Sequence, residues 1–179
     1  MREIKIVLTQ TNTIISKTLK AVSKKNYNHV SISLVDDCST MFSFGRKIVW
    51  LPLIGGFVKE NVNEGVFKMH PETKCKIYTL EVTEDDYNTI ITRLNNFLAE
   101  PNSFRYSFLN VFLMYFNIPF QRKNYFVCSS FVSYLLNGII PLGKEISLVT
   151  PDDYNSLKLN AIYEGRLHDF VNNKAACCS

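Results

Sequence analysis

The chain has 179 residues, a hydrophobic fraction of 46% and a formal net charge of +4. This length suits one domain, and the hydrophobic fraction is enough for one substantial core. Lys and Arg are scattered and cluster only in pairs. A protein that follows a phosphate backbone needs a concentrated basic stripe, so the composition argues against nucleic-acid binding.

The five cysteines stand at positions 38, 75, 128, 177 and 178. Their number is odd and no C-x-x-C spacing occurs, which argues against a disulfide framework and against a zinc site. The N-terminus has charged residues where a signal peptide needs an apolar stretch, and polar residues interrupt the longest apolar region, 104–120. We therefore expect a cytoplasmic protein with reduced thiols, no metal, no cofactor and no integral membrane association.

Hydrophobic spacing predicts the first half of the chain as alternating strands with one helix. In chain order these are a strand over 4–9, a helix over 13–25, a strand over 28–34, a turn at 35–39 and a return strand over 41–44. The last two strands form an antiparallel pair. Residues 48–58 are apolar but contain Pro52 and Gly55-Gly56, which favours a loop or a broken strand.

The second half is predicted to be mainly helical. A strand over 74–82 precedes a capping box at Thr83 that opens a helix through Leu98, and further helices cover 107–116 and 129–136. The first helix has an inner face of Tyr87, Ile90, Ile91, Leu94 and Leu98. We assign 1–171 to one domain and 172–179 to a flexible tail, because the last residues lack any hydrophobic periodicity. The adjacent Cys177 and Cys178 are candidates for acylation.

Cys128 stands where an apolar strand-like run meets an apolar helix-like run. The first amides of a helix have no intrahelical partner and carry the positive end of its dipole, so a thiolate is stabilised there. The alternative is that Cys128 is a small buried core residue, which is the commoner role of a cysteine in an apolar run.

His29 is the candidate base for such a nucleophile. In the strand 28–34, His29 alternates with Val30, which gives the strand one polar and one apolar face. If the turn is centred near Asp37, parity places Ser43 of the return strand on the side of His29, where it could orient the imidazole. Ser43 could equally be a strand serine that faces solvent.

The chain resembles the permuted papain-fold cysteine hydrolases of the NlpC type, in the branch called YiiX-like. The resemblance rests on the order of His29-Val-Ser-Ile32 before Cys128-Ser-Ser-Phe-Val132, with weaker support from the segments 9–11, 41–47 and 55–60. It implies an α+β fold of the permuted papain type, in which the cysteine-bearing helix and additional helices pack on an antiparallel sheet.

The resemblance also implies a third polar residue that orients the histidine. The family often has Glu or His on the strand after the histidine strand, whereas this return strand offers only Ser43, and the nearest downstream carboxylates are Glu60 and Glu64. Glu60 is therefore a second candidate, with a surface charge as the alternative. By analogy with the family's layout, the walls of the substrate cleft come from Thr9, Gln10, Thr11 and Tyr125.

Three functions follow from these expectations. The first is a thiol hydrolase of amide bonds in small peptides or peptidoglycan fragments, in which Cys128 attacks the carbonyl, His29 transfers protons and water resolves the thioester. The second is a lipid acyl hydrolase or acyltransferase of the lecithin:retinol acyltransferase type, favoured only by the apolar segment 48–58. The third is a catalytically silent binding module, favoured only by the missing strand carboxylate.

Overall fold

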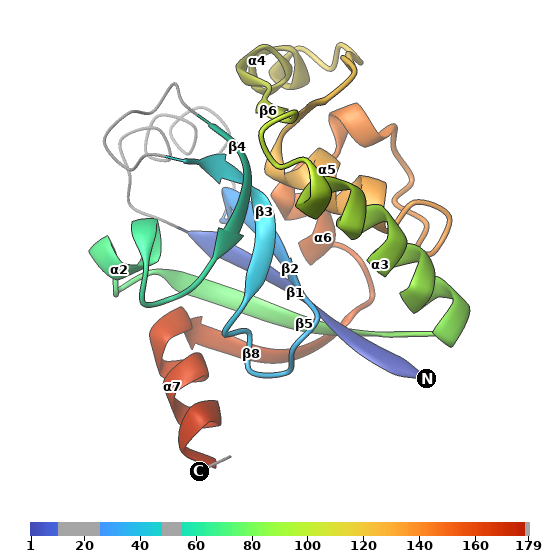
Figure 1. The fold of residues 1–179 in the computed structure, drawn as a ribbon. Helices are drawn as coiled ribbons and strands as arrows, with labels where there is room; N and C mark the ends of the chain where they lie inside the picture. The colour runs from blue at the N-terminus through green and yellow to red at the C-terminus, as the bar shows by residue number, and fades with distance from the viewer. Residues whose placement is uncertain (11–25, 48–54, 178–179) are drawn as a thin grey trace.

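The computed structural model describes residues 1–10, 26–47 and 55–177. The described residues form a mixed α+β structure built on one open, eight-stranded sheet (Figure 1). The strand order is β7-β6-β4-β3-β2-β1-β5-β8, and every pairing is antiparallel except that of β6 with β7. The expected α+β class with a mostly antiparallel sheet is thus confirmed.

The strands follow the predicted pattern closely in the first half of the chain. Their bounds are β1 Arg2–Gln10, β2 His29–Ser33, β3 Met41–Arg46, β4 Gly55–Glu60, β5 Lys74–Val82, β6 Arg105–Tyr106, β7 Tyr125–Phe126 and β8 Asn160–Arg166. The α-helices are α2 Gly65–Met69, α3 Glu84–Ala99, α4 Phe108–Tyr115, α5 Cys128–Leu135, α6 Pro151–Asn155 and α7 Leu167–Cys177, with a 3-10 helix, η1, at Ile146–Leu148.

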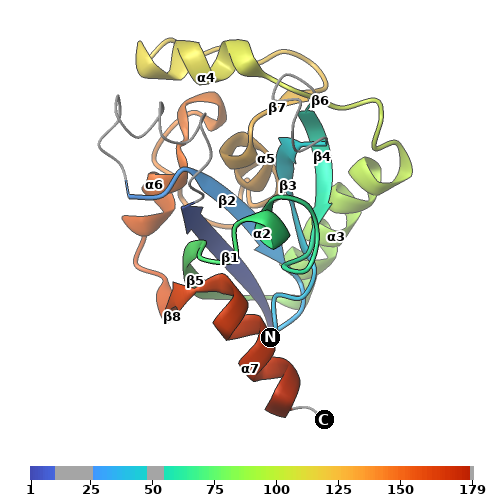
Figure 2. The ribbon, with the colours of Figure 1, turned by 90° about the vertical axis from the view of Figure 1, so that its left-hand side faces the viewer.

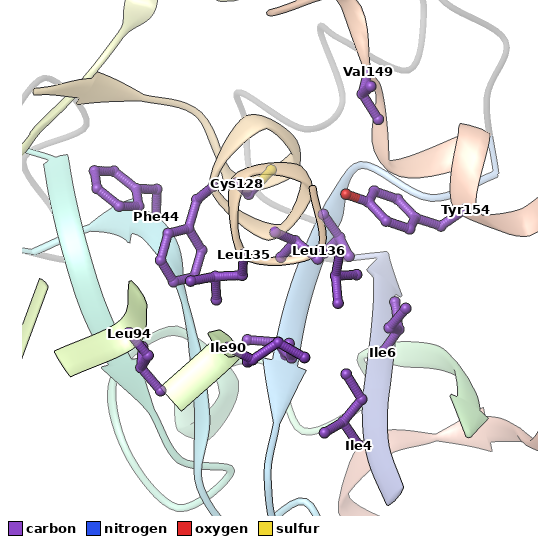
Figure 3. Packing of buried hydrophobic residues seen from close by; sticks show 14 of the residues in the cluster. Ile4, Ile6, Phe44, Ile90, Leu94, Cys128, Leu135, Leu136, Val149 and Tyr154 are labelled. Carbon is purple, nitrogen blue, oxygen red and sulfur yellow. The ribbon is translucent and has the colours of Figure 1, made fainter. Parts of the chain in front are cut away.

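Helices cover both faces of the sheet, and a buried apolar cluster lies on each side. Figures 1 and 2 show α3 and α5 on one side and α2 and α7 on the other. The larger core lies under α3 and α5, where Ile6 of β1, Phe44 of β3 and Leu135 of α5 belong to one buried cluster (Figure 3). The smaller core includes Val7 of β1 and Phe170 of α7, which follows from the alternation of side chains along a strand.

Helix α3 begins as the sequence predicts. The Thr83 hydroxyl accepts a hydrogen bond from the Asp86 amide at 3.1 Å, which satisfies one of the free amides of the first turn. The inner face differs from the prediction at its last position, because Leu98 is 43% exposed. Ile90, Leu94 and Phe97 are the buried side chains, spaced four and three residues apart along one helical stripe.

Of the segment 48–58, which was predicted as a loop or a broken strand, residues 55–58 belong to the regular strand β4 and residues 48–54 lie outside the described residues. The two glycines permit this, because β4 lies in close contact with the strands on either side. A Cβ on Gly55 would lie 2.7 Å from the Tyr106 Cβ, and one on Gly56 would lie 2.7 Å from the Phe104 carbonyl oxygen. Glycine here makes close strand packing possible.

The C-terminal segment also differs from expectation. Residues 172–177, assigned to a flexible tail, continue helix α7, whose Leu167, Phe170 and Val171 are buried in the smaller core. This packing explains why α7 forms without strong periodicity at its end. The predicted helix over 13–25 lies outside the described residues. Among the described helices, none has the length and apolar character needed to cross a membrane.

Candidate active site

Cys128 is the first residue of α5 and follows β7 after a single residue, Val127. The Val127 amide donates to the Ser130 hydroxyl at 3.0 Å, which caps the start of the helix. α5 packs against β2 and β3, so the helix carrying the cysteine lies on the strand that begins with His29. Cys128 itself is 5% exposed. The expected placement of Cys128 at a helix start is confirmed.

The position of α5 is held by buried hydroxyl groups. Ser129 donates to the Val149 carbonyl, and Ser133 lies 2.7 Å from the Tyr154 hydroxyl. Tyr154 also donates to the Ser129 carbonyl at 3.2 Å, and burial raises the pKa of its phenol. These bonds tie the first two turns of α5 to η1 and α6, so the register of Cys128 is well determined.

His29 lies against Glu60, the last residue of β4. The imidazole Nε2 and the Glu60 Oε1 are 2.9 Å apart, and the two side chains are 16% and 15% exposed. A carboxylate only accepts hydrogen bonds, so Nε2 carries the proton and donates. β4 is two strands away from β2 in the sheet, and β3 lies between them.

Ser31 adds a second contact to the same carboxylate. Its hydroxyl donates to the Glu60 Oε2 at 2.5 Å and lies 3.3 Å from the His29 Nε2. Ser31 and His29 are two residues apart on β2 and therefore share a face of the strand. The sequence reasoning did not single out Ser31, although the same alternation places it beside His29.

The electrostatics of His29 link Glu60 with Cys128. Burial by itself lowers the pKa of the imidazole, but the charge of Glu60 and hydrogen bonds to Cys128 and Glu60 outweigh it, and the pKa is raised well above its usual value. The pKa of His29 therefore depends on both the Glu60 carboxylate and the Cys128 thiol.

Ser43 does not orient the imidazole in the way the sequence suggested. Its hydroxyl is buried and donates to the Val30 carbonyl at 2.7 Å. Ile32 pairs with Phe42, so parity places Ser43 on the same side of the strand pair as His29. When this register is continued along the strands, Ser43 lies opposite Ser31, and Gly45 lies opposite His29. Of the two candidates, Ser43 and Glu60, it is Glu60 that forms a hydrogen bond with the imidazole.

Gly45 lies across the strand pair from His29, close to the contact between His29 and Glu60. A Cβ built on it would lie 3.7 Å from the Glu60 Oε1 and 3.9 Å from the His29 Cε1, which are ordinary van der Waals distances. A methyl group at this position would therefore be accommodated beside the two side chains.

Three of the four residues expected to line the cleft, Thr9, Gln10 and Tyr125, are described by the structure. Thr9 pairs with His29 across β1 and β2; it is fully buried, and its hydroxyl has no partner among the described residues. Gln10 lines a cavity of about 510 Å³ with residues of β5 and β8. Tyr125 lies in β7, and the Arg122 guanidinium carbon lies 4.2 Å from the centroid of the Tyr125 ring. Thr11 lies outside the described residues.

Within the described ranges, no group of three or more His, Cys, Asp or Glu side chains is arranged to hold a metal ion. Cys38 and Cys75 are both fully buried free thiols, and burial raises the pKa of each to about 12. They therefore lack the features of a nucleophile, whereas Cys128 has a helix start and an imidazole partner.

Comparisons with known proteins leave the chain without a matching relative: no family model matches it, and neither a curated protein nor a solved structure is significantly similar to it. The chemistry of this chain is therefore inferred from the arrangement of Cys128, His29 and Glu60.

Proposed function

We propose that this protein is a thiol hydrolase that cleaves amide bonds of small peptides or peptidoglycan fragments through a thioester on Cys128. The observation that carries the proposal is the 2.9 Å contact between the His29 imidazole and the Glu60 carboxylate, made by the first residue of the strand on which the Cys128 helix packs. Interactions with Glu60 and Cys128 both raise the pKa of His29. A nucleophile, a base and a group that orients the base are the minimum set for covalent acyl transfer.

Each residue then has a defined role. His29 Nδ1 accepts the Cys128 proton, the sulfur attacks the substrate carbonyl, and the imidazolium gives that proton to the leaving amine. A water molecule, deprotonated by the same nitrogen, cleaves the thioester and releases the acid. Glu60 holds Nε2–H and stabilises the imidazolium, and Ser31 holds Glu60. The Cys128 amide, first in α5, is placed to donate to the oxyanion, an interaction often worth about 3 kcal/mol of barrier.

The proposed fold is the permuted papain type. The order of histidine strand before cysteine helix, together with the packing of α5 on β2 and β3, is what that fold requires and supports the resemblance. The carboxylate that contacts His29, Glu60, stands on β4, whereas the family often places this residue on the strand that follows the histidine strand.

The two other functions have different standing. The silent binding module was favoured by the lack of a strand carboxylate, and Glu60 removes that reason. The lipid acyl hydrolase or acyltransferase uses the same chemistry at Cys128 on an ester, so it differs from the amidase only in substrate. An exposed apolar helix, α4, is the observation that keeps it as the second candidate.

The test is to trap the acyl-enzyme. The full chain is mixed with p-nitrophenyl acetate, and nitrophenol release is followed while intact mass and peptide mapping locate the acetyl group. We expect a burst and one acetyl group on Cys128, with no burst in the Cys128→Ala variant and a greatly slowed burst in His29→Ala. Cys75→Ala is the matched control, because it removes a buried thiol outside the site. Acetylation elsewhere, or an unchanged burst in Cys128→Ala, would overturn the proposal.

Substrate class is tested on the same protein. Acyl-peptide anilides and long-chain glycerol esters are supplied in parallel, and turnover is compared for the wild type and Cys128→Ala. Cys128-dependent turnover of the anilides supports the amidase. Turnover restricted to the long-chain esters replaces it with the lipid acyl function.

A further inference from the structure

Helix α4 presents an apolar face to solvent. Phe108, Leu109, Phe112 and Phe116 are 38%, 53%, 60% and 61% exposed, and Ile118 is 49% exposed. Positions 108, 112 and 116 are four residues apart and so lie along one side of the helix and its C-cap. The Phe112 and Phe116 rings contact each other with centroids 5.0 Å apart. We call these five residues the α4 apolar face.

The opposite side of α4 packs against the protein. Ser107, at the N-cap, and Asn110 are 4% and 2% exposed. The pattern is therefore inverted with respect to an ordinary surface helix, because polar side chains point inward and large apolar ones outward. Scattered single apolar residues on a surface need no explanation, but a contiguous aromatic face of this kind marks an interaction site.

The α4 segment is anchored at both ends close to the candidate site. It leaves the sheet at β6 and returns at β7, two strands joined by the Ser107 amide to the Phe126 carbonyl at 2.9 Å. Cys128 follows two residues after Phe126. Figure 2 shows that α4 lies across one end of the molecule, next to the edge of the sheet formed by β6 and β7.

The charged residues that flank α4 along the chain are all basic, and Glu145 is the acidic residue that lines a cavity together with Arg122 and Lys123. Between Glu100 and Glu145 the sequence contains no acidic residue. Arg105, Arg122 and Lys123 lie in this stretch, in the residues that flank α4, and all three are exposed. An apolar face with a basic border complements a surface that is apolar inside and negatively charged outside.

We propose that the α4 apolar face docks the protein on an anionic lipid surface. α4 has 8 residues, far fewer than the roughly 20 needed to span a bilayer, so it lies in the plane of the interface with its aromatic side buried among acyl chains. Arg105, Arg122 and Lys123 then contact lipid phosphates. A second copy of the chain is a poorer occupant, because symmetric pairing of this face brings two basic borders together.

The test measures binding of the full chain to vesicles by co-sedimentation, with no substrate present, so its result does not depend on the chemistry of Cys128. Vesicles of phosphatidylcholine alone are compared with vesicles that also contain phosphatidylglycerol. We expect binding to the anionic vesicles, weakened by added salt because the lipid charge is screened. The double variant Phe112→Ser/Phe116→Ser is expected to bind at least about tenfold more weakly, since it removes two inserted aromatic side chains.

Two further variants sharpen the result. Arg122→Gln/Lys123→Gln is expected to lose most of the preference for anionic over neutral vesicles. Met69→Ser/Ile162→Ser removes two exposed apolar residues outside α4, 60% and 40% exposed, and is expected to bind like the wild type. Circular dichroism confirms that each variant is folded.

Three outcomes overturn the proposal. The first is that the wild type does not bind vesicles at low salt. The second is that Phe112→Ser/Phe116→Ser binds vesicles as well as the wild type does. The third is that the Met69→Ser/Ile162→Ser control loses as much vesicle binding as Phe112→Ser/Phe116→Ser. Light scattering on the same samples identifies the competing occupant. A concentration-dependent dimer that Phe112→Ser/Phe116→Ser abolishes, without vesicle binding, assigns the face to self-association instead.

Discussion

Glu60 accepts a hydrogen bond from the His29 imidazole at 2.9 Å, although 31 residues separate the two in the chain. β3 lies between their strands, and Gly45 of β3 lies close to the two side chains. The charge of Glu60 raises the pKa of His29, and its hydrogen bond fixes the orientation of the imidazole.

Replacing Glu60 should impair thiol chemistry more than replacing any other carboxylate nearby. Glu60→Gln removes the charge that raises the pKa of His29, and its amide can donate to Nε2 and favour the wrong tautomer. We expect turnover of the activated ester to fall by roughly 10²- to 10⁴-fold. The limb of the pH–rate profile that belongs to His29 should move to lower pH. Glu64→Gln, an exposed carboxylate, is the matched control and should behave as wild type.

Ser31 and Ser43 should separate into a positioning and a structural residue. Ser31→Ala loses the bond to Glu60 and should slow turnover about tenfold, with a shift of the same pH limb. Ser43→Ala leaves the Val30 carbonyl one donor short, so it should lower the free energy of unfolding by about 1 kcal/mol and leave the pH profile unchanged. The reverse result would return the orienting role to Ser43.

Protonation of His29 should stabilise the fold at acidic pH. Its pKa is raised in the folded state, so the stabilisation is fully present below the unfolded value of about 6.5 and is lost as the pH rises through the folded value. Urea unfolding should show that the wild type has a higher free energy of unfolding than His29→Gln at about pH 6. This difference should shrink as the pH rises to about 9. His70→Gln, at a ring that is 27% exposed, is the control. A difference that is constant with pH would contradict the raised pKa.

Cys128 should be alkylated faster than Cys38 and Cys75. Burial raises the pKa of the two latter thiols to about 12, which leaves almost no thiolate at mildly acidic pH. Iodoacetamide labelling followed by peptide mapping, in a protein with Cys177→Ser and Cys178→Ser, gives the three rates. His29→Ala should slow the labelling of Cys128 and leave the other two unchanged. Equal rates at all three cysteines would count against a reactive Cys128.

Local sequence patterns determined much of the framework. The strand over 74–82 and the Thr83 cap of α3 lie where hydrophobic spacing and capping chemistry put them. The helix start at Cys128 was predicted by the change from one period to the other. These features depend on interactions within a few residues, so a single sequence carries them. The end of helix α7 was wrongly predicted as a flexible tail, because this helix forms through burial of Phe170 in a core built from distant residues and not through hydrophobic periodicity.

The candidate site required the tertiary structure. Strand parity put Ser43 on the side of His29, but whether a hydroxyl reaches the imidazole depends on register, and the register sets Gly45 opposite the histidine. The sequence left Ser43 and Glu60 as alternatives because nothing local distinguishes a strand-end carboxylate from a surface charge. Only the placement of β4 beside β3 brings Glu60 to His29, since contacts across non-neighbouring strands arise from sheet order, which no local pattern encodes.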